Sequence, residues 1–169
     1  MSYYRFGAMI LTSTVVMFGL MYLNTYAIDH IFFSQTRMWM ALLMGAVMAF
    51  VMLLFMWGMY KNKVANMLIL AGAVVVFAAS LWLVRSQETV SDVDYMRAMI
   101  PHHSIAILTS TQAHIRDPRV RELADQIIEA QVREIAEMKR LIADLERSPT
   151  SAAAPDLPPL EPETVTATQ

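Results

Sequence analysis

The sequence lacks cysteine altogether and has few charged residues for its length. Without cysteine, the chain cannot form disulfides, zinc fingers, thiolate-ligated iron–sulfur clusters or covalent links to c-type haem. Charged residues make up 17% of its 169 residues, and 56% are hydrophobic. Because soluble domains carry about 25% charged residues, the apolar excess indicates that part of the chain lies outside water.

The charged residues are distributed unevenly along the chain. Residues 1–85 contain five basic residues and one acidic residue, whereas residues 86–147 contain eight basic and eleven acidic residues. The sequence has no basic cluster of the kind that binds nucleic acid, so nucleic acid is not an expected partner. The division predicts a membrane domain over residues 1–85 and an acidic, water-facing domain over residues 86–147.

Three apolar runs in the membrane domain predict three transmembrane helices. They cover residues 6–28, 38–60 and 64–84. Each run is close to the ~20 residues that a helix needs to cross ~30 Å of hydrocarbon. The expected partner of this domain is therefore a lipid bilayer.

Basic residues beside the predicted spans indicate an orientation. Arg5 precedes the first span, and Lys61 and Lys63 lie between the second and third. Basic loop residues favour the cytoplasmic side, which predicts a cytoplasmic N-terminus and a C-terminal domain on the opposite side. Arg85 and Arg97 favour the reverse orientation but are fewer.

The water-facing domain has the pattern of two amphipathic helices. The first is expected over residues 92–114, where Ser91 and Asp94 resemble a capping box at its start. Pro101 lies inside this helix. Because proline removes a backbone donor and clashes with the preceding turn, we expect a kink or break near Ile100.

The second helix is expected to begin after Asp117, as the N-cap, with Pro118 at its first position. It continues to about Arg147, with apolar residues recurring at spacings of three and four. The predicted fold is therefore all-α, with three transmembrane helices followed by an antiparallel helical hairpin. Residues 148–169 contain proline, alanine, threonine, serine and three acids, and we expect them to be a disordered tail.

Four candidate metal ligands lie close together on the first hairpin helix: Met96, Met99, His102 and His103. Thioether and imidazole donors together suit copper, and thioether favours the cuprous ion. On a regular helix Met99 and His103 share a face. Adjacent histidines point about 100° apart, so both bind one ion only if the proline kink re-aims one of them.

Antiparallel pairing of the two helices adds donors from the second. Met138 then lies within a turn of Met96 and Met99, and Glu134 lies close to Met99 and His102. The alternative is that the methionines fill the hydrophobic core, to which Met adapts readily, and that the histidines cap or solvate a kinked turn. The candidate metal site comprises Met96, Met99, His102, His103, Glu134 and Met138.

Methionine also recurs at every fourth position of the second span. A stripe of this kind could carry cuprous ions across a membrane, but it is more often packing against helices or lipid. The spans lack the buried acidic or basic pairs that usually mark ion pathways. The residues of this methionine stripe are Met40, Met44, Met48, Met52 and Met56.

The hairpin carries two linked sequence patterns. The first is Asp-aromatic-x-x-x-Met-Ile-x-His-His-x-x-Ala-Ile, and the second is Leu-Ala-x-x-Ile-x-x-x-Gln-x-x-Glu-Ile-x-x-Met. In both patterns, residues 92–145 resemble the bacterial family called domain of unknown function 305. The residues that match are Asp94, Tyr95, Met99, Ile100, His102, His103, Ala106, Ile107, Leu123, Ala124, Ile127, Gln131, Glu134, Ile135 and Met138.

This resemblance implies a ferritin-like hairpin, frequent export and a link to copper binding. The resulting hypothesis is a protein of the bacterial inner (cytoplasmic) membrane that sequesters or hands over copper at the periplasmic face. The alternative is a structural or assembly subunit whose hairpin docks a partner and binds no metal. Catalysis is not expected, because the sequence has no Glu-x-x-His pair or nucleophile motif. A two-helix domain buries little core, so a homo-oligomer or larger membrane complex is expected.

Overall fold

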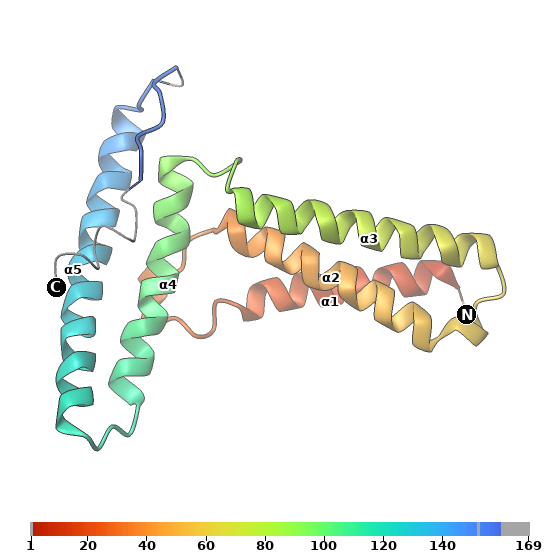
Figure 1. Cartoon of the computed structure of the whole chain (residues 1–169), viewed down its shortest axis with the longest axis horizontal. Helices are drawn as coiled ribbons and strands as arrows, with labels where there is room; N and C mark the ends of the chain where they lie inside the picture. The colour runs from red at the N-terminus through yellow and green to blue at the C-terminus, as the bar shows by residue number, and fades with distance from the viewer. Residues whose placement is uncertain (1, 152, 160–169) are drawn as a thin grey trace.

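The computed structural model describes residues 2–151 and 153–159, and within them the fold is entirely helical, with no strand. Figure 1 shows three long helices side by side and a hairpin of two more across one end, opposite the N-terminus. This confirms the predicted all-α fold, with three long apolar helices before a helical C-terminal domain. The elements are α1 (Tyr3–Leu20), the 3-10 turn η1 (Ile28–His30), α2 (Gln35–Phe55), the 3-10 turn η2 (Trp57–Met59), α3 (Lys63–Ser86), α4 (Asp92–Gln112) and α5 (Pro118–Arg147).

Helices α1, α2 and α3 are each long and apolar enough to cross a membrane. The first predicted span, over residues 6–28, is too long at its C-terminal end, because α1 stops at Leu20. The backbone beyond it bonds outside the helix: the carbonyl of Met21 accepts from Arg37, and the N–H of Tyr26 donates to Ser104. The 18 residues of α1 extend about 27 Å, slightly less than the hydrocarbon thickness.

Side-chain caps set the starts of the other two apolar helices. Ser34 Oγ accepts from the N–H of Arg37 at 3.2 Å and starts α2 three residues before the predicted span. The α-helix ends at Phe55, and the chain continues through η2 instead of extending to residue 60 as predicted. Asn62 Oδ1 accepts from the N–H of Ala65 at 3.1 Å and starts α3.

Contacts between the apolar helices depend on small and polar residues. A Cβ added to Gly45 of α2 would overlap Thr14 Oγ1 of α1, so any larger residue there would have to displace the threonine side chain or move the two helices apart. Near the N-terminus, the hydroxyl of Tyr3 donates to Oδ1 of the buried Asn66 at 2.7 Å. Asn66 Nδ2 in turn donates to the carbonyl of Tyr60 at 3.1 Å. These bonds satisfy a buried amide and join the start of α1 to α3.

Helices α4 and α5 form the antiparallel hairpin and enclose an apolar core. Met96, Ile100, Ile107, Ile135 and Ile142 are its buried members. The break expected near Ile100 does not occur, since α4 runs through Pro101 from Asp92 to Gln112. Both Ile100 and Pro101 are fully buried, and their packing holds the proline within the helix.

The predicted starts of both hairpin helices are confirmed. Ser91 Oγ accepts from the N–H of Asp94 at 3.2 Å, and Asp117 Oδ1 accepts from the N–H of Arg119 at 2.9 Å. After Arg147, residues 148–151 and 153–159 form no helix or strand. The remainder of the predicted disordered tail, residues 152 and 160–169, lies outside the described residues.

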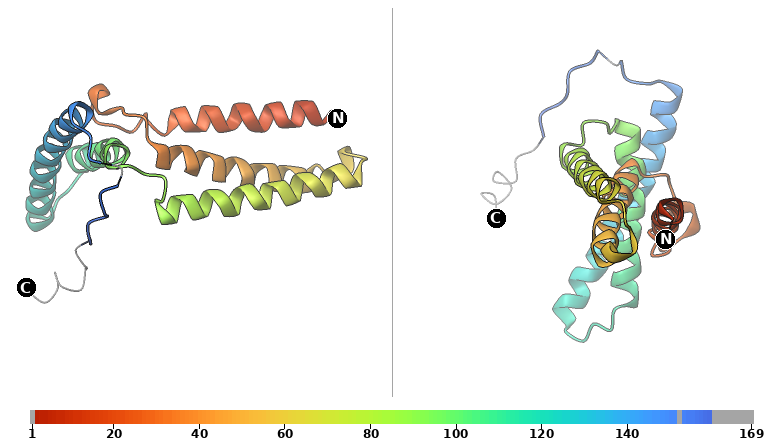
Figure 2. Two further views of the ribbon diagram at one scale, coloured as in Figure 1. Left: turned by 90° about the horizontal axis from the view of Figure 1, so that it is seen from above. Right: turned by 90° about the vertical axis from the view of Figure 1, so that its right-hand side faces the viewer.

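The loop between α1 and α2 joins the hairpin to the apolar helices. The hydroxyl of the buried Ser104 accepts from the N–H of Tyr26 at 2.7 Å, and Nδ1 of His30 lies 2.9 Å from the same oxygen. Lys139 of α5 donates to Asp29 at 2.7 Å, and Phe32 packs against the hairpin core. Figure 2 shows the hairpin lying across the end of the apolar helices.

Candidate metal site

A groove of about 810 Å³ lies beside the contact between α4 and α5. Met96 and His103 line it from α4, where a spacing of seven residues returns both to the same face. Glu134 and Met138 line it from α5, where a spacing of four does the same. The groove therefore collects four of the six candidate ligands predicted from the sequence.

His103 and Glu134 face each other across this groove. Nδ1 of His103 lies 3.2 Å from Oε2 of Glu134, with 15% of the histidine side chain and 41% of the glutamate side chain exposed. The approach is within ion-pair distance, but its angles do not make a hydrogen bond, and Nδ1 is buried without another partner. A buried ring nitrogen next to a carboxylate is a candidate position for a proton or a cation.

Burial lowers the pKa of His103 below its usual value, against the opposing effect of the Glu134 carboxylate, with a further lowering from His102. The folded protein therefore favours the neutral imidazole, which is the form that binds metal ions. Gln131 Nε2 donates to Oε2 of Glu134 at 3.4 Å, which helps to orient the carboxylate.

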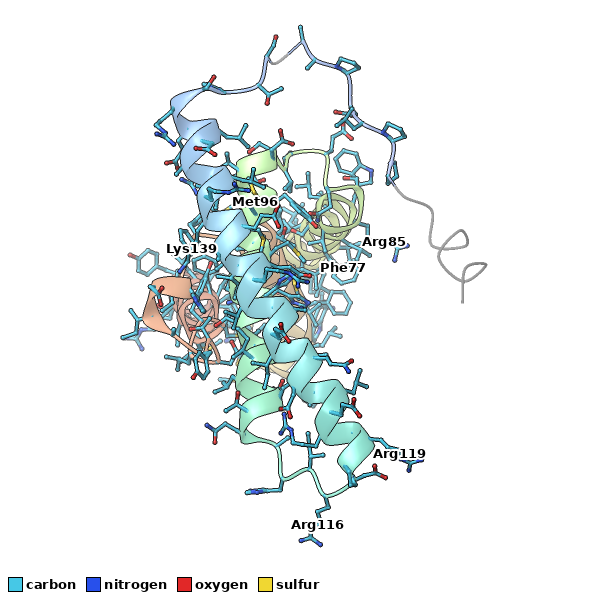
Figure 3. All side chains as sticks on the ribbon, turned by 90° about the vertical axis from the view of Figure 1, so that its left-hand side faces the viewer. Phe77, Arg85, Met96, Arg116, Arg119 and Lys139 are labelled. Atoms are coloured by element: carbon cyan, nitrogen blue, oxygen red, sulfur yellow. The ribbon has the colours of Figure 1, made fainter. Side chains whose placement is uncertain are left out.

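The two methionines of the groove also belong to the hydrophobic core. Met96 is only 7% exposed, and Met138 is partly buried against the same core. Figure 3 shows Met96 on the hairpin far from the turn that carries Arg116 and from Arg119 at the start of α5. Met96 and Met138 therefore pack in the hydrophobic core and also line the groove.

Met99 and His102 lie on a different face of α4. They line a second cavity, of about 250 Å³, together with the start of α2. Helix α4 continues through Pro101, and the two neighbouring histidines line different pockets, with 6.3 Å between the centroids of their rings. The six predicted ligands therefore divide into a groove set of four and a pair at the α2–α4 junction.

One residue of the second cavity was not connected with the hairpin by sequence reasoning. Met40, the first member of the methionine stripe, lines this cavity beside Met99 and His102. The stripe itself was visible in the sequence, but no local pattern indicated that α4 would lie against the start of α2.

The donor types restrict the ions that these sites suit. Within residues 2–151 and 153–159, no three histidine, aspartate or glutamate side chains cluster closely enough to hold a metal ion. A hard-cation or zinc site made of those groups alone is therefore not indicated. A site built from His103, Glu134, Met96 and Met138 would combine one imidazole and one carboxylate with thioether sulfur, a set that favours soft, late transition-metal ions, although Asp92 and Glu137 also line the groove.

The comparisons with known proteins extend over both halves of the chain. Residues 91–167 match the family described as "Domain of unknown function (DUF305)". An uncharacterized protein, L153, of Acanthamoeba polyphaga mimivirus is 30% identical over 146 residues, covering 80% of this chain and 92% of the viral protein. No solved structure matches the chain. The alignment with the viral protein is too long to be confined to the hairpin, and together with the hairpin match it establishes that the chain belongs to the DUF305 family.

Proposed function

We propose that this protein is a membrane-anchored, non-catalytic copper-binding protein that sequesters or hands over cuprous ions. The observation that carries the proposal is the His103–Glu134 pair, 3.2 Å apart in a groove that Met96 and Met138 also line. A neutral imidazole and two thioethers are the donors that cuprous copper prefers.

The groove fits such an ion in three respects. The lowered pKa of His103 favours the neutral ring, in which one nitrogen carries no proton and can bind a metal. Among the described residues the buried Nδ1 atom has no hydrogen-bond partner, so binding a cation there would satisfy it. The Glu134 carboxylate supplies negative charge beside it, and a bound copper ion would add a soft Lewis acid that thioether sulfur stabilises.

The proposed anchoring rests on the three apolar helices, and the proposed orientation rests on their number and on the basic residues beside them. An odd number of spans places the hairpin on the opposite side from the N-terminus, and Arg5, Lys61 and Lys63 favour the cytoplasm. We therefore place the hairpin at the periplasmic face of a bacterial inner membrane. Alkaline phosphatase fused after Arg147 would be active and a fusion at Asn62 inactive, and the reverse pattern would overturn this orientation.

The test of copper binding uses the full chain in mild detergent. Cuprous ion is titrated without oxygen against a competing chelator, for the wild type, His103→Ala and Met138→Leu. We expect His103→Ala to weaken the groove site by more than about tenfold, because it removes a ligand. Met138→Leu keeps the side-chain volume and removes the sulfur, and we expect a smaller loss.

Met67→Leu is the matched control, because Met67 is an exposed methionine of α3 away from the groove. It should leave both affinity and stoichiometry unchanged. If His103→Ala binds as many cuprous ions as the wild type, and as tightly, the groove is not a copper site.

The second candidate function is a structural or assembly subunit that binds no metal. It is favoured by the apolar part of the same groove, where Val90, Tyr95, Leu141 and Leu145 form a lining that a partner helix could cover. A purified full chain that remains free of copper after equilibration, but copurifies in a complex of defined composition, would support this alternative. In either case we expect a homo-oligomer or a larger membrane complex.

A further inference from the structure

An open pocket of about 250 Å³ lies at the junction between α2 and α4, and three soft or borderline donors line it. Met40 and His102 are exposed there. Met99 and His102 lie three residues apart on the face of α4 that meets α2. Met40 lines the cavity from the second turn of α2. These residues come from segments that are far apart in the sequence, and the contact between hairpin and apolar helices brings them together.

The two sides of this cavity are each fixed by bonds outside it. The start of α2 is held because the N–H of the buried Ser34 donates to the hydroxyl of Tyr22 at 2.9 Å. Helix α4 is held because Ser104 bonds to the backbone of Tyr26. The placement of Met40 beside Met99 and His102 therefore follows from a defined interface.

Arg37 is the charged residue among the described residues that line the cavity. Its guanidinium donates to the carbonyl of Met21 and lies 4.6 Å from the centre of the Tyr22 ring, which directs it toward the loop after α1 but leaves its positive charge in place. The other polar lining residues, Ser34, Thr36 and Gln87, are neutral. Among the described residues that line the cavity, none has a carboxylate, which a hard divalent cation would require.

We propose that Met40, Met99 and His102 bind a second cuprous ion at the junction between the hairpin and the membrane helices. Two thioethers and one imidazole are a donor set for this ion. The inference extends the proposed function, since it takes the same ion as cargo, but it concerns residues that are separate from the groove. The chain would thus hold one ion in the hairpin groove and one at the membrane surface.

The methionine stripe ends at this site without forming a continuous pathway. Met44 and Met48 line a shallow groove on the surface of α2 with Leu43, Val47 and Val51. Met52 and Met56 pack against the core cluster of Phe6, Leu53 and Tyr60. We therefore assign metal binding to Met40 alone among the stripe residues, and packing to the last two.

The test is the number of cuprous ions that the full chain binds in mild detergent, measured without oxygen against a chelator. We expect two ions for the wild type and one for Met40→Leu, for Met99→Leu and for His102→Ala. His103→Ala should also retain one ion, at the junction. X-ray absorption of copper-loaded His103→Ala should then show mixed sulfur and nitrogen ligation, with the sulfur contribution falling in Met40→Leu/His103→Ala.

Met44→Leu is the matched control, because it lies one turn from Met40 on the same helix and outside the junction cavity. It should bind two ions. A wild-type stoichiometry of one that Met40→Leu leaves unchanged and His103→Ala abolishes would overturn the junction site and leave the proposed function standing. Loss of both ions in Met40→Leu would also overturn it, because the sites would not be separate. A chain that binds no copper would overturn both proposals.

Discussion

Nδ1 of His30 lies 2.9 Å from Oγ of Ser104, and this contact joins the loop between α1 and α2 to the hairpin. The same oxygen accepts from the N–H of Tyr26 at 2.7 Å. A serine hydroxyl can accept one bond and donate another, so the arrangement suits a neutral histidine ring. Lys139, which Figure 3 shows on the side of α5 nearest this loop, adds its bond to Asp29.

Removing the Ser104 hydroxyl should loosen the hairpin from the apolar helices. Ser104→Ala leaves the N–H of Tyr26 and the ring of His30 without their shared partner, at a cost of about 1–3 kcal/mol for the unsatisfied groups. We expect faster hydrogen exchange in residues 21–34, measured by mass spectrometry. Thr109→Ala is the control, because the hydroxyl of Thr109 bonds only within α4. Equal exchange in the two variants would contradict a role for Ser104 in attachment.

The attachment of the loop should weaken in mild acid. Burial lowers the pKa of His30 below its usual value of 6.5, the positive charge of Lys139 lowers it further, and Asp29 opposes them. At pH values between the pKa of His30 in the folded protein and 6.5, the unfolded chain binds more protons than the folded one. The contribution of neutral His30 to the free energy of unfolding is therefore fully present above about pH 6.5 and is lost as the pH falls through the pKa of the folded state.

Thermal unfolding in detergent between pH 5 and 8 measures this dependence. His30→Gln should flatten part of it. His103→Gln should flatten another part, since burial also lowers the pKa of His103. His114→Gln, which replaces an exposed histidine at the end of α4, is the control. Identical pH profiles for the wild type and His30→Gln would show that His30 does not control the attachment.

The contact of α1 with α2 should depend on the absence of a side chain at Gly45. In Gly45→Ala the new methyl group would overlap the hydroxyl of Thr14. Either this hydroxyl gives up its bond to the carbonyl of Ile10, or α1 moves away from α2. We expect a loss of about 1–3 kcal/mol from overpacking. The double variant Thr14→Ala/Gly45→Ala should recover most of it, as measured by unfolding in mixed detergent.

Gly72→Ala controls for the change from glycine itself, because Gly72 also lies inside an apolar α-helix and a Cβ there meets nothing within 4 Å. If the two substitutions are additive, with no recovery in the double variant, then Thr14 and Gly45 do not form the close contact.

The sequence was sufficient for the helices and much of their capping. Apolar runs and three- and four-residue periodicity depend on local chemistry, and Ser91 and Asp117 cap α4 and α5 as their residue types predict. The ends of α1 and α2 were less accessible. Residues 21–28 prolong the first predicted span in the sequence, but their backbone bonds to Arg37 and Ser104, which are distant in sequence.

The candidate site was only partly accessible for the same reason. Helical spacing and antiparallel pairing placed Met138 within a turn of Met96, and both residues line the groove. The same pairing placed Glu134 close to Met99 and His102, whereas Glu134 faces His103. Spacing and pairing could not determine whether Pro101 would re-aim a histidine, because that depends on the packing around Ile100. In the structure α4 is continuous, and Met99 and His102 lie outside the groove. The approach of Met40 depends on how the hairpin lies across the apolar helices, for which no local pattern exists.

The outer flank of α5 should be the surface through which two copies of the chain associate. Val120, Leu123 and Ile127 recur at spacings of three and four beside the buried seam, and Val120 and Leu123 are 51% and 57% exposed. Because successive residues of an α-helix are rotated by about 100° around its axis, Leu141 lies on the same flank as Leu123. Two hairpins that cover these residues would complete a four-helix bundle.

The change that tests this association is Leu123→Glu/Ile127→Glu, which keeps good helix formers but places charge on the flank. We expect the wild type to be a dimer in mild detergent and the double variant a monomer of unchanged helicity, by light scattering and circular dichroism. Val132→Glu is the control, because Val132 is 54% exposed but lies on the other flank of α5. Since Leu141 also lines the metal groove, the second copy would lie beside that groove. A monomeric wild type, or a double variant of the same mass as the wild-type dimer, would show that this flank does not join two chains.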